Sequence, residues 1–229
     1  MFGKKVVVFS LVVLAVVSQA HGNKVDDLLR RLKAAVDKAM VQAQEQLDRS
    51  KVQLQQHAAE DVADGRAQIE VIKKGYVDQL DKIKADNKDK DISSCLGENE
   101  TKLNNLVTDY GIQMDNCVND KINEGTKYAQ DALDRVKKIV SDVENIRQEI
   151  KDCGHGWKAA KCIAKLAVRI EKEITNLPTI IEGDVVVTAA RIAQLDPKLK
   201  GCATDKVNEA RTQGQTLLDT IKQCVANIH

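Results

Sequence analysis

Six cysteines constrain the fold of this chain more than any other sequence feature. They stand at Cys95, Cys117, Cys153, Cys162, Cys202 and Cys224. Outward from the central pair, the spacings on one side nearly mirror those on the other. Steps of this size return to nearly the same side of an α-helix, since each residue turns it by about 100°. The spacing therefore predicts an antiparallel helical hairpin whose cysteines face one another across the two arms.

Facing residues of an antiparallel pair have residue numbers with a constant sum. The outermost and the middle cysteine pairs share one sum, and the innermost pair comes close to it. Six cysteines allow fifteen connectivities, among which sequence does not strictly choose. The geometry favours the nested set: Cys95–Cys224, Cys117–Cys202 and Cys153–Cys162.

The N-terminus has the pattern of a secretory signal peptide. Lys4 and Lys5 precede an apolar run over residues 6–17, and Ser18 and Ala20 place small residues at the cleavage positions. An even number of cysteines in an extracellular chain favours disulfides, because the compartment is oxidising. The apolar run is too short to span a bilayer, so no transmembrane segment is expected.

The charge balance excludes one class of partner. The chain has 35 basic and 34 acidic residues, and loss of Lys4 and Lys5 with the signal peptide leaves 33 basic residues. A protein near neutrality lacks the basic excess that binds nucleic acid. An extracellular protein, a glycan or a microbial surface is the expected kind of partner, and the residues do not indicate an oligomeric state.

Composition and periodicity predict long amphipathic helices. The chain has two prolines and few aromatic residues, and its apolar residues recur at steps of three and four. In the last helix this spacing predicts one apolar stripe, made of Val207, Ala210, Gly214, Leu217, Ile221, Cys224 and Ile228. We expect an all-α fold: an elongated antiparallel helical hairpin, cross-linked by disulfides and packed with a third long N-terminal helix. The expected segments are a signal peptide over 1–20, an N-terminal helical arm and polar linker over 21–92, and the hairpin domain over 93–229.

Breaks between the helical arms are expected at polar, glycine and proline positions. The polar run over residues 86–91 predicts a loop, and Gly154 with Gly156 predicts the hairpin turn. Proline is unfavourable inside a helix. We therefore expect a kink or short loop near residues 177–184, around Pro178, and a second break over residues 197–201.

No catalytic constellation is present in the sequence, so neither an enzyme nor a cofactor is expected. The four histidines have no partner at helical spacing, and the carboxylates alternate with lysines as on a solvated helix face. A zinc site using Cys153, His155 and Cys162 is the alternative to a disulfide at the turn. It lacks a fourth ligand nearby, so the disulfide is favoured.

Three features bear on interactions. Asn99-Glu100-Thr101 is an acceptor sequence for N-glycosylation. Trp157, beside the turn, is either a contact residue for a partner or a residue that packs over the end of the hairpin. The first arm carries no cysteine; it is either an ordinary bundle helix or a segment that swings out onto lipid.

The signal peptide, the helical composition and the cysteine region from Cys95 to Cys224 resemble the TsetseEP-type domain of secreted dipteran proteins. The local matches are Ser94-Cys95, Asn116-Cys117-Val118 and Gln223-Cys224-Val225, and the chain lacks the Glu-Pro repeats of the type protein. The resemblance implies a non-enzymatic protein of the gut or body fluids, linked to defence, and it implies no functional residues.

Two functions remain open from the sequence. The leading hypothesis is a secreted, non-enzymatic interaction or structural protein with a cross-linked helical scaffold. The alternative is an extracellular carrier of lipid or another apolar ligand. Few aromatic residues and three cross-links disfavour a large internal cavity, because cross-links resist the opening that a carrier needs.

Overall fold

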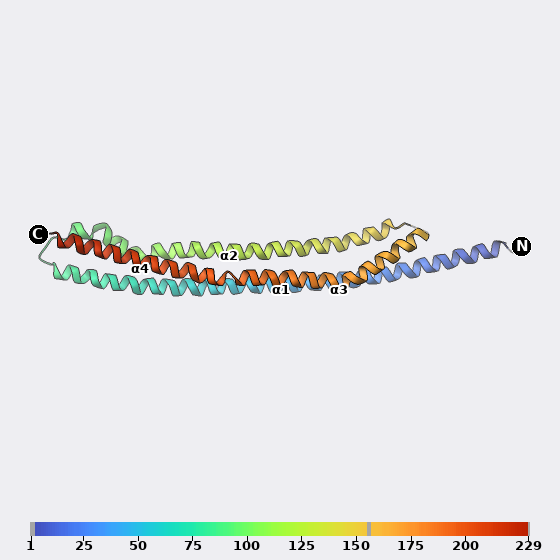
Figure 1. Ribbon diagram of the computed structural model, residues 1–229, viewed down its shortest axis with the longest axis horizontal. Coiled ribbons are helices and arrows are strands. Elements are labelled where there is room, and N and C mark those ends of the chain that lie inside the picture. The colour runs from blue at the N-terminus through green and yellow to red at the C-terminus, as the bar shows by residue number, and fades with distance from the viewer. Residues whose placement is uncertain (1–2, 155–156, 229) are drawn as a thin grey trace. The chain divides into compact units, whose positions relative to one another are not determined.

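A computed structural model describes the backbone of residues 3–154 and 157–228 and the side chains of residues 24–154 and 158–228. Its helices are α1 (Gly3–Asp86), α2 (Ser93–Asp152), α3 (Trp157–Ala193) and α4 (Asp196–Ala226), and these ranges contain no strand (Figure 1). The predicted all-α fold is confirmed. The predicted signal peptide falls on residues whose side chains lie outside the described ranges.

The chain divides into two compact units. The first comprises Met1–Arg49 and Tyr128–Ala190, and the second comprises Ser50–Lys127 and Arg191–His229. Each unit therefore combines a stretch of α1 with a stretch of α2 and a third helical segment from the C-terminal part of the chain. This is the expected hairpin packed with the N-terminal helix.

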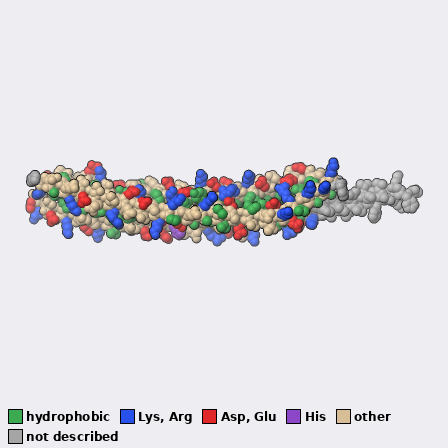
Figure 2. Space-filling model, viewed as in Figure 1, with side chains coloured by type: hydrophobic (Ala, Val, Ile, Leu, Met, Phe, Trp, Pro, Cys, Tyr) green, Lys and Arg blue, Asp and Glu red, His purple; other side chains and the backbone are tan. Residues whose placement is uncertain are grey.

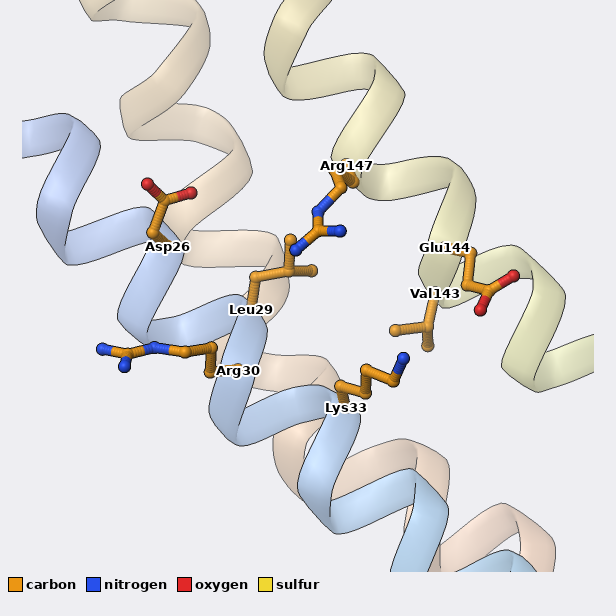
Figure 3. A pocket seen from close by; sticks show the side chains of 7 residues that line it. All are labelled: Asp26, Leu29, Arg30, Lys33, Val143, Glu144 and Arg147. Atoms are coloured by element: carbon orange, nitrogen blue, oxygen red, sulfur yellow. The ribbon is translucent and has the colours of Figure 1, made fainter.

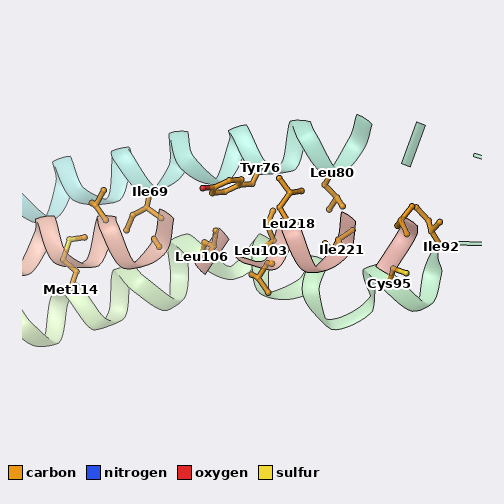
Figure 4. Close-up of a cluster of buried hydrophobic side chains, with 14 of the residues drawn as sticks. Ile69, Tyr76, Leu80, Ile92, Cys95, Leu103, Leu106, Met114, Leu218 and Ile221 are labelled. Atoms are coloured by element: carbon orange, nitrogen blue, oxygen red, sulfur yellow. The ribbon is translucent and has the colours of Figure 1, made fainter. Parts of the chain in front are cut away.

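The core of the second unit is a cluster of aliphatic side chains from α1, α2 and α4 (Figure 4). Ile69, Leu103 and Leu218 are fully buried within it. The apolar stripe predicted for the last helix faces this core, since its members Val207, Ala210, Gly214, Leu217 and Ile221 are all buried. Burial of one face per helix is what the three-four periodicity requires.

Close helix packing in the second unit depends on Gly214 of α4. A Cβ atom at this position would lie 2.4 Å from Cε2 of Tyr76 and 3.2 Å from Cδ1 of Leu106. The ring of Tyr76 is held in place, because its hydroxyl donates a hydrogen bond of 2.9 Å to the carbonyl oxygen of Arg211. Only a residue without a side chain fits beside this ring.

The first unit has an aliphatic core of its own. Fully buried residues come from all three of its segments and include Leu32 of α1, Ala132 of α2 and Ile170 of α3. Ion pairs join α2 to α3: Arg135 with Asp184, at 3.0 and 2.9 Å, and Arg169 with Glu149, at 2.8 Å. The later residue of α2 pairs with the earlier residue of α3, so these two helices are antiparallel.

The short loop predicted as one alternative around Pro178 does not form, because α3 continues as a helix through this residue. Proline there removes one helical hydrogen bond at a cost of about 3 kcal/mol. Ile181 and Val185, which follow on the same helix, are each only 1 % exposed. Burial of two such side chains contributes a comparable amount, about 1.5 to 3 kcal/mol each, and offsets the cost.

The second predicted break, over residues 197–201, is displaced. The chain turns at Gln194 and Leu195, and α4 begins at Asp196 with Pro197 in its first turn. The first turn of a helix tolerates proline because its amide groups have no intrahelical acceptor. Pro197 therefore starts a helix, and Gly201 lies inside it.

The other connections agree with the sequence pattern, with one addition. Helix α1 ends at Asp86, and the Asp91 carboxylate accepts hydrogen bonds from the backbone and hydroxyl of Ser93 at the start of α2. Gly154 has a φ of 68°, as expected of the hairpin turn. The addition is a kink in α2 at Gly97, where φ is 23° and ψ is −116°.

Candidate functional site

The cysteines form three disulfides with the predicted nested pairing. Their Cα atoms lie 5.5 Å apart in Cys95–Cys224, 5.8 Å in Cys117–Cys202 and 5.7 Å in Cys153–Cys162. The first two join α2 to α4 in the second unit, and the third joins the end of α2 to the start of α3 in the first unit. Such bridges stabilise the fold chiefly by restricting the unfolded chain.

The third disulfide overturns the zinc alternative at the turn. Cys153 and Cys162 are bonded to each other, and a zinc ion needs both as free thiolates. His155 and the side chain of Trp157 lie outside the described residues, so the proposed contact role of Trp157 stays a prediction. No group of three or more potential metal ligands occurs among the side chains that the structure describes.

The glycosylation sequence lies just after the kink in α2. The half-buried Asn99 donates from Nδ2 to the carbonyl oxygen of Cys95 at 3.4 Å, and Thr101 donates from Oγ1 to the carbonyl oxygen of Gly97 at 3.3 Å. Both acceptors belong to the turn that Gly97 distorts. The acceptor amide is therefore held against the backbone in the folded chain, four residues from the outer disulfide.

A group of titratable side chains joins α1 to α4 in the second unit. Nδ1 of His57 lies 3.0 Å from Oδ2 of Asp196, at the start of α4, and both side chains are substantially exposed. Partial burial raises the pKa of the Asp61 carboxyl above its ordinary value, while the nearby charge of Lys200 opposes this rise. A polar contact as exposed as that between His57 and Asp196 contributes little to stability.

A groove with charged residues on both walls lies between α1 and α2 in the first unit (Figure 3). Its volume is about 350 Å³, within the range of small-molecule sites. The lining residues are Asp26, Leu29, Arg30 and Lys33 of α1 and Val143, Glu144 and Arg147 of α2. None of them was singled out by the sequence pattern, because nothing in the sequence indicates which exposed charges of two distant segments come together.

A second groove of the first unit lies between α1 and α3. It has a volume of about 510 Å³, and Pro178, Ile181, Glu182 and Val185 line it from α3. The side facing them on α1 is mostly alanine, glutamine and glutamate, with Arg49 at one end. Glu45 and Arg49 form an ion pair with each other at 3.3 Å, so Glu182 is the remaining charge of this lining.

One comparison with known proteins is informative. The sequence model of the family described as "Protein of unknown function (DUF725)" matches residues 91–206, about half of the chain. The chain belongs to this family. The matched region begins just before α2 and ends within α4, and it contains five of the six cysteines.

The sixth cysteine, Cys224, lies beyond the matched region but forms the outer disulfide with Cys95. The family description assigns no activity. No curated protein and no solved structure shows significant similarity to the chain. Among the described residues, no helix has a stretch long and apolar enough to cross a membrane.

Proposed function

We propose that this chain is a secreted, non-enzymatic helical protein whose outer surface binds an extracellular partner, namely a protein, a glycan or a microbial surface. The observation that carries the proposal is the pairing of a disulfide-linked aliphatic core with an exterior of interspersed charges. The disulfides and the aliphatic core keep the outer side chains in a fixed arrangement that a partner can recognise. The interior is filled by packed side chains.

The interior supports this proposal directly. The buried side chains of the described residues are aliphatic with few exceptions, and Thr188 is the buried polar residue among them. Figure 2 shows Lys and Arg side chains interspersed with Asp and Glu over the visible described surface, with hydrophobic side chains scattered between them. Mixed charge keeps a secreted protein soluble and leaves recognition to local patches.

Secretion rests on two independent features. The N-terminal pattern of Lys4, Lys5 and the apolar run over residues 6–17 is typical of a signal peptide. The three disulfides are of the kind that persists in oxidising compartments. From the resemblance to TsetseEP-type proteins, we further propose that the protein acts in the gut or body fluids, in a role linked to defence.

Expression of the full chain in a secretory cell line tests secretion. We expect the protein in the medium with His21 as its first residue and with a glycan on Asn99. The Thr101→Ala variant abolishes the acceptor sequence, whereas Thr101→Ser preserves it and serves as the matched control. Retention of the wild-type protein inside the cells, or an uncleaved N-terminus, would contradict the proposal.

Binding experiments separate this function from the carrier alternative. We expect the oxidised protein to sediment saturably with intact microbial cells or to bind within a glycan panel, and not to float with liposomes. A carrier would expose buried residues such as Leu103, Ile146 and Ile221 to lipid. Flotation with liposomes, together with a rise in helicity, would replace the proposed function by the alternative.

A further inference from the structure

We propose that the groove between α1 and α2 in the first unit binds a small organic carboxylate with an apolar body, such as a short fatty acid. This inference is independent of the proposed surface function, because it concerns one defined site. It rests on two cations, an apolar floor and the charge balance of the lining.

The two cations come from opposite walls of the groove. Figure 3 shows the guanidinium of Arg147, on α2, directed toward Leu29, and the ammonium of Lys33, on α1, directed toward Val143. Within the described side chains, neither cation forms an ion pair. Two uncompensated cations that converge on one hollow attract an anion.

The remaining charges of the lining do not neutralise these two. Arg30 pairs with Asp27 at 3.1 Å, and Figure 3 shows the side chains of Asp26 and Glu144 directed away from the space between Arg147 and Lys33. The lining as a whole holds three cations and two carboxylates. Since Arg30 is paired with Asp27, which lies outside the lining, the lining has no net excess of positive charge; the two converging cations therefore suit a monoanion better than a dianion or a polyanion.

The floor of the groove is apolar. Leu29 lies beside the guanidinium of Arg147 and Val143 beside the ammonium of Lys33, and the two apolar residues are 8 % and 4 % exposed. These two residues have little surface left to cover, but most of the surface that the groove as a whole exposes is apolar, which favours an apolar group next to the anion. An inorganic anion would pair with the two cations but would leave the apolar surface of the groove in contact with water.

The donor types select a carboxylate among monoanions. A guanidinium offers a planar fork of donors that matches the two oxygens of a carboxylate, and an ammonium adds a point charge from the other side. Both side chains are exposed in the unliganded protein. Binding therefore requires little desolvation of the protein before the ligand arrives.

The test uses the mature, oxidised protein and isothermal titration with octanoate below its micelle-forming concentration. We expect one saturable site per chain. The double variant Lys33→Gln/Arg147→Gln should bind at least about tenfold more weakly, because each charge-assisted hydrogen bond contributes that order of affinity. Lys33 and Arg147, like the two positions of the control variant described next, are exposed, so circular dichroism should show unchanged helicity in both double variants.

The matched control is Lys38→Gln/Lys138→Gln. It removes the same two charges from the same two helices of the same unit but lies outside the groove lining. Its affinity should stay within about twofold of the wild type, since neither side chain lines the groove and the charges of exposed side chains are weakened by water and salt. Equal loss in the two double variants would overturn the proposal in favour of a diffuse effect of net charge.

Other probes test the ligand class. We expect octanoate to bind more tightly than acetate, which lacks the apolar body, and more tightly than 1-octanol, which lacks the charge. Inorganic phosphate that binds as tightly as octanoate would show a general anion site, and 1-octanol that binds as tightly would show a purely apolar one. Either result, or no binding of octanoate to the wild type, refutes the assignment.

Discussion

The close contact between Gly214 and the ring of Tyr76 makes Gly214→Ala a sensitive test of the packing in the second unit. Alanine normally stabilises a helix by about 1 kcal/mol relative to glycine. At this position, however, the new Cβ atom would lie 2.4 and 2.5 Å from two carbons of the Tyr76 ring. These distances are too short for any contact, so either the ring or helix α4 must move.

The cost of that movement can be estimated from the contacts. An extra carbon in a well-packed core costs about 1 to 3 kcal/mol. Displacement of the ring also breaks the hydrogen bond from the Tyr76 hydroxyl to the carbonyl oxygen of Arg211, which is worth about 1 kcal/mol. After the helix-propensity gain of about 1 kcal/mol is subtracted, Gly214→Ala should lower the free energy of unfolding by about 1 to 3 kcal/mol.

Gly75→Ala is the matched control. Gly75 lies inside α1 in the same unit and is exposed, and a Cβ atom added there would have no heavy-atom neighbour within 4 Å. This variant should raise the free energy of unfolding by about 1 kcal/mol. Urea denaturation of both oxidised variants, followed by circular dichroism, measures the difference. If Gly214→Ala is stabilised as much as Gly75→Ala, the close contact with Tyr76 does not exist.

Three further predictions concern the outer disulfide, a buried tyrosine and the proline of α3. With Cys117–Cys202 intact, the outer bridge Cys95–Cys224 closes a loop of about 45 residues, so the double variant Cys95→Ser/Cys224→Ser should lose about 4 kcal/mol of stability in denaturant melts. An unchanged midpoint would mean that side-chain packing alone stabilises this end of the fold. Burial raises the pKa of Tyr76, so its contribution to stability is complete below the unfolded value of about 10 and is lost as the pH rises through the folded pKa. The alkaline loss of stability should be smaller in Tyr76→Phe, and equal losses in the two proteins would refute this. Pro178→Ala should raise the stability by about 1 to 3 kcal/mol, since it restores a helical hydrogen bond; a lower melting temperature would show that the proline ring is needed for packing.

Much of the fold could be predicted from spacing. The cysteine positions predicted both the antiparallel direction of the arms and the three bridges, because facing residues of antiparallel helices keep a constant index sum. The apolar stripe from Val207 to Ile221 predicted which face of the last helix is buried. These predictions succeeded because they depend on the period of a helix, which is the same in any environment.

Local rules failed where tertiary packing outweighed them. The helix through Pro178 persists because the following turns bury Ile181 and Val185. The rule that proline breaks a helix does not include the free energy of that burial. The kink at Gly97 had only a single glycine as its signal, and most glycines of this chain lie in regular helix. The displaced second break shows the converse, since Pro197 starts a helix in its first turn.

The helical class, the direction of the arms and a preference for the nested disulfide pairing follow from periodicity along the chain. Which charges share a hollow does not follow from that periodicity and is a property of the packed helices. Lys33 and Arg147 are far apart in the sequence, and each stands on an exposed helix face like many other cations of the chain. Their convergence depends on how two helices are rotated about their axes, and that rotation is set by the packing of the buried side chains of all three segments.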